Sequence, residues 1–137
     1  MSKLTSIMLV DDCKATNYRY RLVIEKYGCA ESGVEKYNGR EALDYLTTEI
    51  DGNCPQPELV FLDINMPVMN GWEFLEDYTK LQIGQQAGAV VVMLAASLNP
   101  DDRLKADERD DVTSFSTKPL TMEKLRETLD KFYPEFA

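Results

Sequence analysis

Three acidic residues and one lysine in this chain follow short apolar runs. Asp11 and Asp12 come directly after the first run, Asp63 directly after a later one, and Lys118 lies three residues beyond Phe115 near the C-terminus. Short apolar runs that alternate with helical patterns are typical of parallel strands, whose carboxyl ends gather at one edge of the sheet. Clustered carboxylates repel one another unless a cation joins them, and an oxygen-rich site suits Mg²⁺. The spacing therefore predicts a magnesium site at that edge.

Each of these residues has a chemical use at such a site. A carboxylate such as Asp63, at the end of an apolar strand, must be exposed at the rim or paired, and as a nucleophile it can attack phosphorus to form an acyl phosphate. Asp11 and Asp12 can face one ion only if the chain turns after the strand. Lys118 would pair with the carboxylates and could move to a phosphoryl oxygen, and its bond to Pro119 is a candidate for the cis form. Taken alone, each residue also fits an ordinary role as a loop acid, a helix cap or a surface lysine.

The whole chain shows five alternating strand and helix patterns. Strands are predicted over residues 6–10, 30–37, 59–62, 89–94 and 112–116, and helices over 16–27 and from about 38, 70, 99 and 121 onward. This alternation predicts an α/β fold with an open, doubly wound parallel sheet and helices on both faces. The run at 89–94 is the most apolar, so we expect it at the centre of the sheet.

Cap and turn residues mark several helix ends. Gly28 is placed to end the first helix, and Asn38 stands where the second opens. Asn70 and Glu73 have the spacing of a capping box, and Thr121 precedes the last helix. These signals support the predicted boundaries.

Composition limits the class of protein. The 137 residues fit one domain over 1–137, and the net charge of −9 argues against nucleic-acid partners and anionic membrane surfaces. The absence of histidine excludes Ser-His-Asp and Cys-His catalysis. Three widely spaced cysteines and the lack of a signal-peptide pattern indicate a reduced, cytoplasmic protein. The longest apolar stretch, residues 87–96, is half of what a membrane span needs.

Three segments together resemble the receiver domain of two-component response regulators. They read Leu9-Val10-Asp11-Asp12, then Leu62-Asp63-Ile64-Asn65-Met66-Pro67-Val68-Met69-Asn70-Gly71, then Thr117-Lys118-Pro119-Leu120. The resemblance covers residues 6–132 and implies a flavodoxin-like, five-stranded fold of the receiver type.

This resemblance implies a division of roles. Asp63 would be the phosphoacceptor. It would receive its phosphoryl group from the phosphohistidine of a sensor histidine kinase or a histidine phosphotransfer protein. Mg²⁺, or Mn²⁺ in its place, would be held by Asp11, Asp12, Asp63 and the backbone carbonyl of Asn65. Lys118 would contact the phosphoryl oxygens.

The resemblance also implies a conformational switch, and here the chain departs from the family. Phe115 falls on the aromatic switch position, while Pro67 and Gly71 would shape the loop beside the site. The family usually has Thr or Ser at the end of the fourth strand, where this chain has Ala95. A hydrogen bond to a charged group is worth roughly 1.5–3 kcal/mol, so its loss would weaken the coupling of phosphorylation to conformation. Ser97 compensates only if the strand ends later than predicted.

Three functions from different classes are therefore weighed. The chain stops at Ala137, just after the last helix, so we expect a stand-alone phosphoacceptor rather than an enzyme, acting as a monomer or weak dimer. It would signal to an unidentified downstream protein by contact, or pass its phosphoryl group along a phosphorelay. The alternative is a pseudo-receiver, an interaction module in which Ala95 leaves phosphorylation weak or uncoupled. A flavin or nucleotide enzyme is disfavoured, because the loop at 11–14 is acidic and Asn65 stands where aspartate-nucleophile phosphatases have a second acid.

Overall fold

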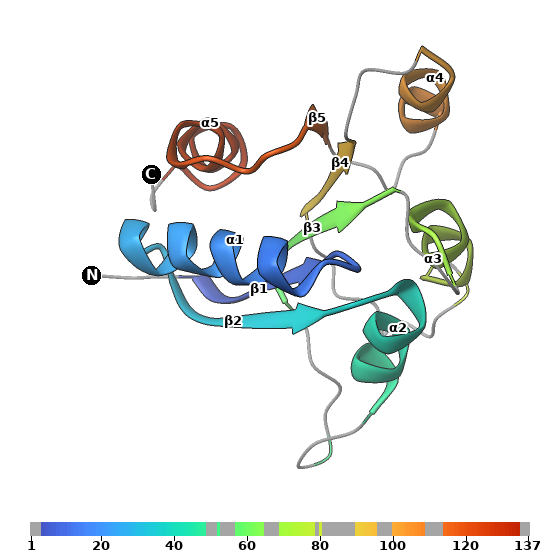
Figure 1. The fold of residues 1–137 in the computed structure, drawn as a ribbon, viewed down its shortest axis with the longest axis horizontal. Coiled ribbons are helices and arrows are strands. Elements are labelled where there is room, and N and C mark those ends of the chain that lie inside the picture. Colours follow the sequence, from blue (N-terminus) through green and yellow to red (C-terminus); the bar gives the residue numbers. More distant parts are fainter. Residues whose placement is uncertain are drawn as a thin grey trace.

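The computed structural model describes residues 4–48, 52, 57–64, 69–78, 80, 90–95, 100–108 and 114–134. Within them, five strands form one parallel sheet: β1 (Leu4–Val10), β2 (Ala30–Lys36), β3 (Leu59–Asp63), β4 (Val90–Ala95) and β5 (Ser114–Thr117). They lie in the order β2-β1-β3-β4-β5 (Figure 1). The predicted doubly wound parallel sheet is confirmed. The strand order reverses between β1 and β3, and such a reversal opens a ligand site at the carboxyl edge.

The described residues form five helices, four of which cover the two faces of this sheet. They are α1 (Lys14–Tyr27), α2 (Gly39–Thr47), α3 (Gly71–Tyr78), α4 (Pro100–Glu108) and α5 (Met122–Phe132). Helices α1 and α5 pack together on one face, and α2 and α3 on the other, with α4 beside β5 (Figure 1). None of the described helices is long and apolar enough to cross a lipid bilayer.

Strand β3 joins the two apolar layers of the core. All five of its residues are buried. Val60 and Leu62 belong to the layer under α2 and α3, whereas Leu59 and Phe61 belong to the layer under α1 and α5. A strand with apolar side chains on both faces has to lie inside a doubly covered sheet. Asp63, at its end, is therefore fixed relative to both layers.

The prediction that the most apolar strand lies at the centre was wrong. The middle position belongs to β3, and β4 lies between β3 and the edge strand β5. Both β3 and β4 have a neighbour on each side and helices over each face. An apolar sequence indicates that a strand is buried, but it does not distinguish the middle strand from the strand next to it.

The predicted caps are present. Gly28 has a φ of 78°, a left-handed conformation that favours glycine, and its N–H donates to the Ile24 carbonyl at the end of α1. The Asn38 side chain accepts from the N–H of Glu41 at the start of α2. At α3, Asn70 and Glu73 cap each other reciprocally, with N···O distances of 2.9 and 3.1 Å. The Thr121 hydroxyl accepts from the third N–H of its helix.

Some boundaries differ from prediction. Helix α1 begins at Lys14, two residues early, and β5 runs to Thr117. On α3, Phe74 and Leu75 are fully buried, and Trp72 packs partly buried against the same apolar layer. The predictions for the segments at 65–68, 81–89 and 96–99 lie outside the described residues.

Gly71 allows a close approach between the start of α3 and the end of β3. Its N–H donates to the Ile64 carbonyl at 2.9 Å, so the start of α3 lies against the end of β3. A Cβ on Gly71 would stand 2.7 Å from the Asp63 carbonyl oxygen and 3.1 Å from Cα of Ile64. Both are backbone atoms, which cannot swing aside as a flexible side chain can.

Gly71→Ala should therefore destabilise the protein by about 1–3 kcal/mol, since overpacking costs more than the gain in helix propensity. Gly33→Ala is the matched control, because the nearest atom to its added Cβ would be the flexible Arg21 Cγ at 3.4 Å. Urea unfolding followed by circular dichroism measures both variants. Equal midpoints for the two would show that the close approach at Gly71 is relieved without cost.

Candidate functional site

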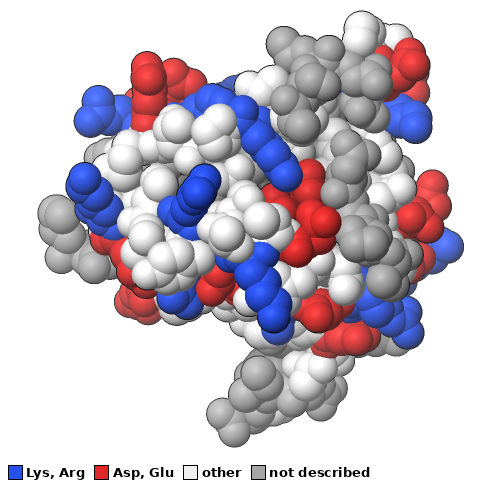
Figure 2. Space-filling view, viewed as in Figure 1, with Lys and Arg blue, Asp and Glu red and all other residues white. Residues whose placement is uncertain are grey.

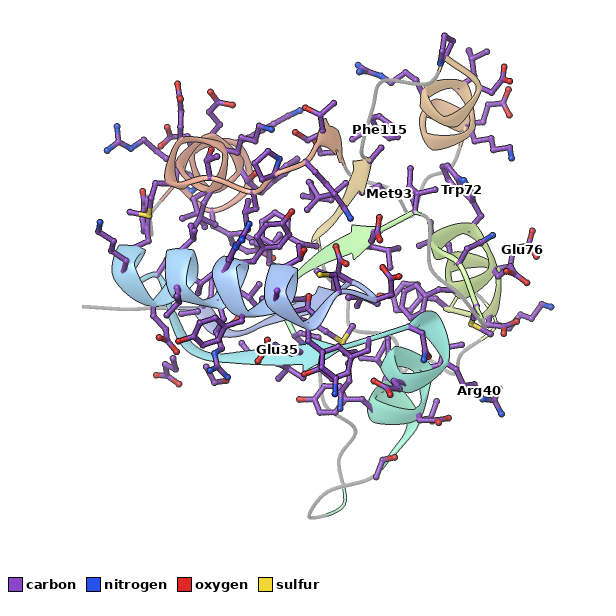
Figure 3. All side chains as sticks on the ribbon, viewed as in Figure 1. Glu35, Arg40, Trp72, Glu76, Met93 and Phe115 are labelled. Atoms are coloured by element: carbon purple, nitrogen blue, oxygen red, sulfur yellow. The ribbon has the colours of Figure 1, made fainter. Side chains whose placement is uncertain are left out.

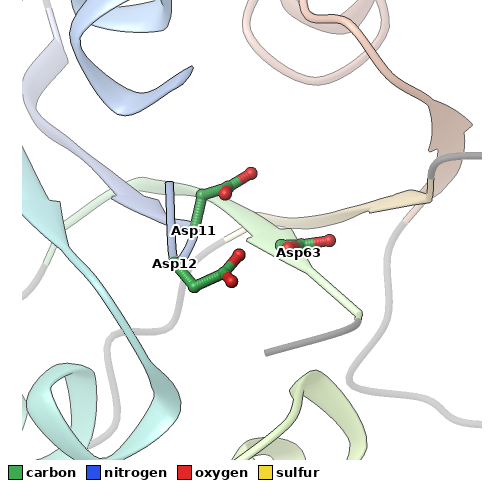
Figure 4. A group of neighbouring side chains, drawn as sticks. All are labelled: Asp11, Asp12 and Asp63. Atoms are coloured by element: carbon green, nitrogen blue, oxygen red, sulfur yellow. The ribbon is translucent and has the colours of Figure 1, made fainter. Parts of the chain in front are cut away.

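The three acidic residues predicted to meet do so at the carboxyl edge of the sheet (Figure 4). Asp11 and Asp12 follow β1, and Asp63 is the last residue of β3. One carboxylate oxygen from each lies within 4.8 Å of the others. Asp11 and Asp63 are 2% and 3% exposed, while Asp12 is exposed to solvent. The cluster therefore has a buried floor and an open side.

Strand register and a turn explain this convergence. β1 and β3 are parallel neighbours, with Val10 opposite Leu62, so the next residue on each strand is an aspartate. Beyond Val10 the chain turns: the Cys13 N–H donates to Oδ1 of Asp11 at 2.9 Å, and α1 begins one residue later. This is the turn that two consecutive acids need if both are to face one point.

Lys118 completes the cluster from the connection between β5 and α5. Its Nζ lies 2.9 Å from Oδ2 of Asp11 and 3.2 Å from Oδ1 of Asp63. Its own N–H donates to the Ala95 carbonyl at 2.8 Å, which ties the lysine's backbone to the end of β4. The Lys118–Pro119 peptide bond is cis, as the sequence suggested. Four residues from three distant segments thus share one site.

The electrostatics of the cluster favour a divalent cation. Burial by itself lowers the pKa of Lys118, but the hydrogen bond to Asp11 and the charges of Asp63 and Asp11 outweigh it, so the pKa of Lys118 is raised. With all three carboxylates ionised, this lysine leaves a formal charge of −2 on the cluster. Oxygen ligands and that charge fit Mg²⁺ or Mn²⁺. Asn65, whose carbonyl was also predicted as a ligand, lies outside the described residues.

Of the three clustered acids, Asp12 is the one exposed to solvent. Acidic side chains gather near the centre of the view in Figure 2, with Lys and Arg side chains on more than one side of them. A phosphorylated group that approached this face would meet basic as well as acidic side chains.

The two predicted switch residues lie on neighbouring strands, β4 and β5. Ala95 is the last residue of β4 and is 3% exposed, so the strand does end where the sequence placed a methyl group instead of a hydroxyl. Phe115 on β5 is opposite Met93 and packs partly against the apolar layer under α2 and α3 (Figure 3). The Arg103 guanidinium lies 5.9 Å from its ring centroid. Ser97 lies outside the described residues.

One polar residue beside the cluster was missed by the sequence analysis. Asn17 on α1 is completely buried and donates to the carbonyls of Asp11 and Lys36, at 3.0 Å each. Its signal was its place on the helix: with Tyr20 and Ile24 it shares the buried face of α1. An asparagine at a core position of a helix requires polar partners.

Comparison with known proteins identifies the family. The family model described as "Response regulator receiver domain" matches residues 7–130. The chain belongs to this family. It is 28% identical to sporulation initiation phosphotransferase F of Bacillus subtilis, over 93% of both chains, and 27% identical to the chemotaxis protein CheY of Thermotoga maritima, over 91% of this chain and 94% of that one. Among solved structures, a two-component response regulator from Cytophaga hutchinsonii matches with a TM-score of 0.84 and 29% identity, over 95% of this receiver and 97% of that chain.

The same domain also forms part of larger relatives. The receiver is 29% identical to part of the sensory/regulatory protein RpfC of Xanthomonas campestris, of which it covers 16%. It is also similar over nearly its whole length to small proteins such as PilH of Pseudomonas aeruginosa, at 24% identity and 96% of that protein. Receiver identity and two-component signalling thus rest on relatives of both kinds.

Proposed function

We propose that this receiver is a Mg²⁺-dependent phosphoacceptor in which Asp63 carries the phosphoryl group. The observation that supports this most directly is the meeting of Asp11, Asp12 and Asp63 within 4.8 Å, with the Lys118 ammonium bonded to two of them. Within the described residues, this is the cluster that could hold a metal ion. Asp63 is the buried acid at the end of the middle strand, where it can receive a phosphoryl group without a rearrangement of the fold.

The transfer is a single displacement at phosphorus. A carboxylate oxygen of Asp63 forms a bond to the phosphorus of a phosphohistidine, the P–N bond breaks, and its electron pair stays on the imidazole nitrogen. Asp11 and Asp12 would hold the metal together with Asp63. When bound, Mg²⁺ neutralises charge on the phosphoryl oxygens. Lys118, freed from Asp63 once that carboxylate carries the phosphoryl group as an acyl phosphate, is within reach of a phosphoryl oxygen.

The proposed partners are a sensor histidine kinase or a histidine phosphotransfer protein upstream, and another protein downstream. Tyr18 and Leu22 on α1 are 52% and 44% exposed and stand one helical turn apart, so they offer an apolar patch on the helix that begins beside the acid pair. The acidic net charge disfavours nucleic acid and anionic membranes as partners. The proposed location is cytoplasmic, since three widely spaced cysteines fit a reducing compartment. No separate catalytic activity is proposed, because the phosphoryl group stays on the receiver or moves to another protein.

Intact mass after incubation with acetyl phosphate tests this function. With Mg²⁺ the wild type should gain one phosphoryl group, and with EDTA it should gain none. Mn²⁺ should substitute for Mg²⁺, and Asp63→Asn is the control variant. Absence of an adduct on folded wild type that still binds Mg²⁺ would favour the pseudo-receiver, the interaction module that does not depend on phosphorylation.

The complete acid cluster argues against the pseudo-receiver. Ala95 affects the conformational response to phosphorylation and not phosphorylation itself. A methyl group at the end of β4 cannot donate to a phosphoryl oxygen, so nothing at this position couples the modified Asp63 to Phe115. The receiver we propose is therefore phosphorylated normally, but phosphorylation shifts its conformation only weakly.

Ala95→Thr should strengthen the switch. A hydroxyl that bonds a charged phosphoryl oxygen is worth roughly 1.5–3 kcal/mol, which is about a tenfold or larger shift toward the inward position of Phe115. Fluorine NMR of fluorophenylalanine-labelled protein, with the Phe115 signal assigned by substitution, measures this shift after phosphorylation. Ala95→Val has the shape of threonine without the hydroxyl and should behave like the wild type. If both variants respond equally, packing rather than hydrogen bonding sets the switch.

A further inference from the structure

Helix α1 is joined to β2 by two side-chain bonds one helical turn apart. Nδ2 of Asn17 donates to the carbonyl of Lys36 at 3.0 Å. Nη1 of Arg21 donates to Oε2 of Glu35 at 2.9 Å, on the strand that Figure 3 marks by its Glu35 label. The two bonds reach consecutive residues of the same edge strand, but only the first lies at the end of β2 that adjoins the acid cluster.

Asn17 differs from Arg21 in having a second partner. The same Nδ2 donates to the backbone carbonyl of Asp11 at 3.0 Å. The Asp11 N–H in turn donates to the Lys36 carbonyl at 3.0 Å, which extends the ladder between β1 and β2 by one bond. Both hydrogens of the Asn17 amide are thus used to join the last peptide groups of two neighbouring strands.

These bonds hold the turn that carries the acid pair. Asp11 is fixed on its carbonyl side by Asn17 and on its side-chain side by the Cys13 N–H, which donates to Oδ1 at 2.9 Å. The Asn17 N–H donates to the Cys13 carbonyl at 3.1 Å and closes the first turn of α1. One residue therefore contacts both ends of the segment in which Asp12 lies, although it touches neither acid's carboxylate.

The chemistry of the side chain shows which of its atoms matters. Asn17 has no exposed surface, and its Oδ1 accepts no hydrogen bond within the described part of the chain. A buried acceptor without a partner destabilises the fold. The amide oxygen at this position is therefore unfavourable, and only the hydrogen bonds donated by the amide nitrogen stabilise the structure. The two donated bonds are what asparagine supplies here.

We propose that Asn17 is a positioning residue that sets the metal affinity of the site by fixing the turn at Asp11 and Asp12. This inference rests on the proposed function, because it concerns the metal that the acid pair would hold. Residues that orient metal ligands from behind change affinity by about tenfold to a hundredfold when they are replaced. Asn17 has that relation to Asp11.

Metal binding by matched variants tests the proposal. Electron paramagnetic resonance of free Mn²⁺ gives the Mn²⁺ dissociation constant, and competition gives that of Mg²⁺. Asn17→Leu keeps the side-chain size and removes both donors together with the unpaired acceptor. Arg21→Met is the control, because it cuts the neighbouring bond between α1 and β2 and leaves the turn untouched. Circular dichroism at the same temperature confirms that each variant is folded, so a merely structural loss would appear as unfolding and not as weaker binding by folded protein.

We expect Mg²⁺ and Mn²⁺ to bind Asn17→Leu at least tenfold more weakly than the wild type, and Arg21→Met to bind them as the wild type does. Equal affinity in all three proteins overturns the proposal, and so does an equal loss in both variants, which would show that any loosening of α1 has this effect. If Asn17→Leu does not fold, Asn17→Ser replaces it, because its shorter side chain cannot reach both carbonyls. A wild type that binds neither metal would instead contradict the proposed function, and this inference with it.

Discussion

Asp63→Asn should take up no phosphoryl group and, in the absence of metal, should be more stable than the wild type. The amide has the shape of the carboxylate but is no nucleophile at phosphorus, so the adduct disappears entirely. Stability rises because one of two buried neighbouring carboxylates is neutralised, while Lys118 keeps its shorter contact, 2.9 Å, to Asp11. We expect a gain of about 1 kcal/mol, since the substitution removes the repulsion between two neighbouring carboxylates and leaves the pair of Lys118 and Asp11 intact.

Mg²⁺ should reverse that order of stability. The wild type gains about 2.7 kcal/mol when the metal is a hundredfold above its dissociation constant, whereas the variant has lost a charged ligand and gains little. Urea unfolding with EDTA and with Mg²⁺, alongside intact mass, measures both effects. Asp44→Asn, an exposed acid of α2, is the control and should match the wild type throughout. An adduct on Asp63→Asn, or equal metal stabilisation of both proteins, would show that another acid is the acceptor or ligand.

The meeting of Asp11, Asp63 and Lys118 could be predicted because it follows from topology alone. Parallel strands place their carboxyl ends at one edge, so any polar residue directly after a strand arrives there whatever the order of the strands. The caps at Gly28 and Asn38 were predictable for a similar reason, since a helix end needs partners within a few residues of itself. Neither inference required knowledge of distant packing.

What could not be predicted depends on contacts between elements. The sequence placed β4 rather than β3 in the middle of the sheet, because both strands are buried on both faces and read alike. Asn17 was overlooked because an asparagine inside a helix is usually solvent-facing. Its role is visible only once the ends of β1 and β2 are known to lie beside it.

Lys118→Met should weaken the fold and slow phosphorylation, yet tighten Mg²⁺ binding. Removing the ammonium leaves Asp11 and Asp63 buried side by side without their shared cation, and breaking such a pair costs about 3–5 kcal/mol. The cluster then has a formal charge of −3, so a divalent cation is attracted more strongly and restores much of the lost stability. Phosphoryl uptake should still fall about a hundredfold, the usual effect of removing one preorganised charge from a transition state.

The dependence of stability on pH separates this charge effect from lost packing. Because the pKa of Lys118 is raised on folding, its contribution is fully present below the ordinary lysine pKa of 10.5 and is lost as the pH rises through the folded value. The free-energy difference between wild type and Lys118→Met, measured with EDTA, should therefore be constant at neutral pH and shrink above about pH 10.5. Lys124→Met is the matched control: its ammonium donates to the Thr117 carbonyl at 2.6 Å and pairs with no carboxylate in the described part of the chain, so its Mg²⁺ affinity should equal that of the wild type. A pH-independent difference for Lys118→Met, with unchanged Mg²⁺ affinity, would mean that the lysine acts through its alkyl chain and not through its charge.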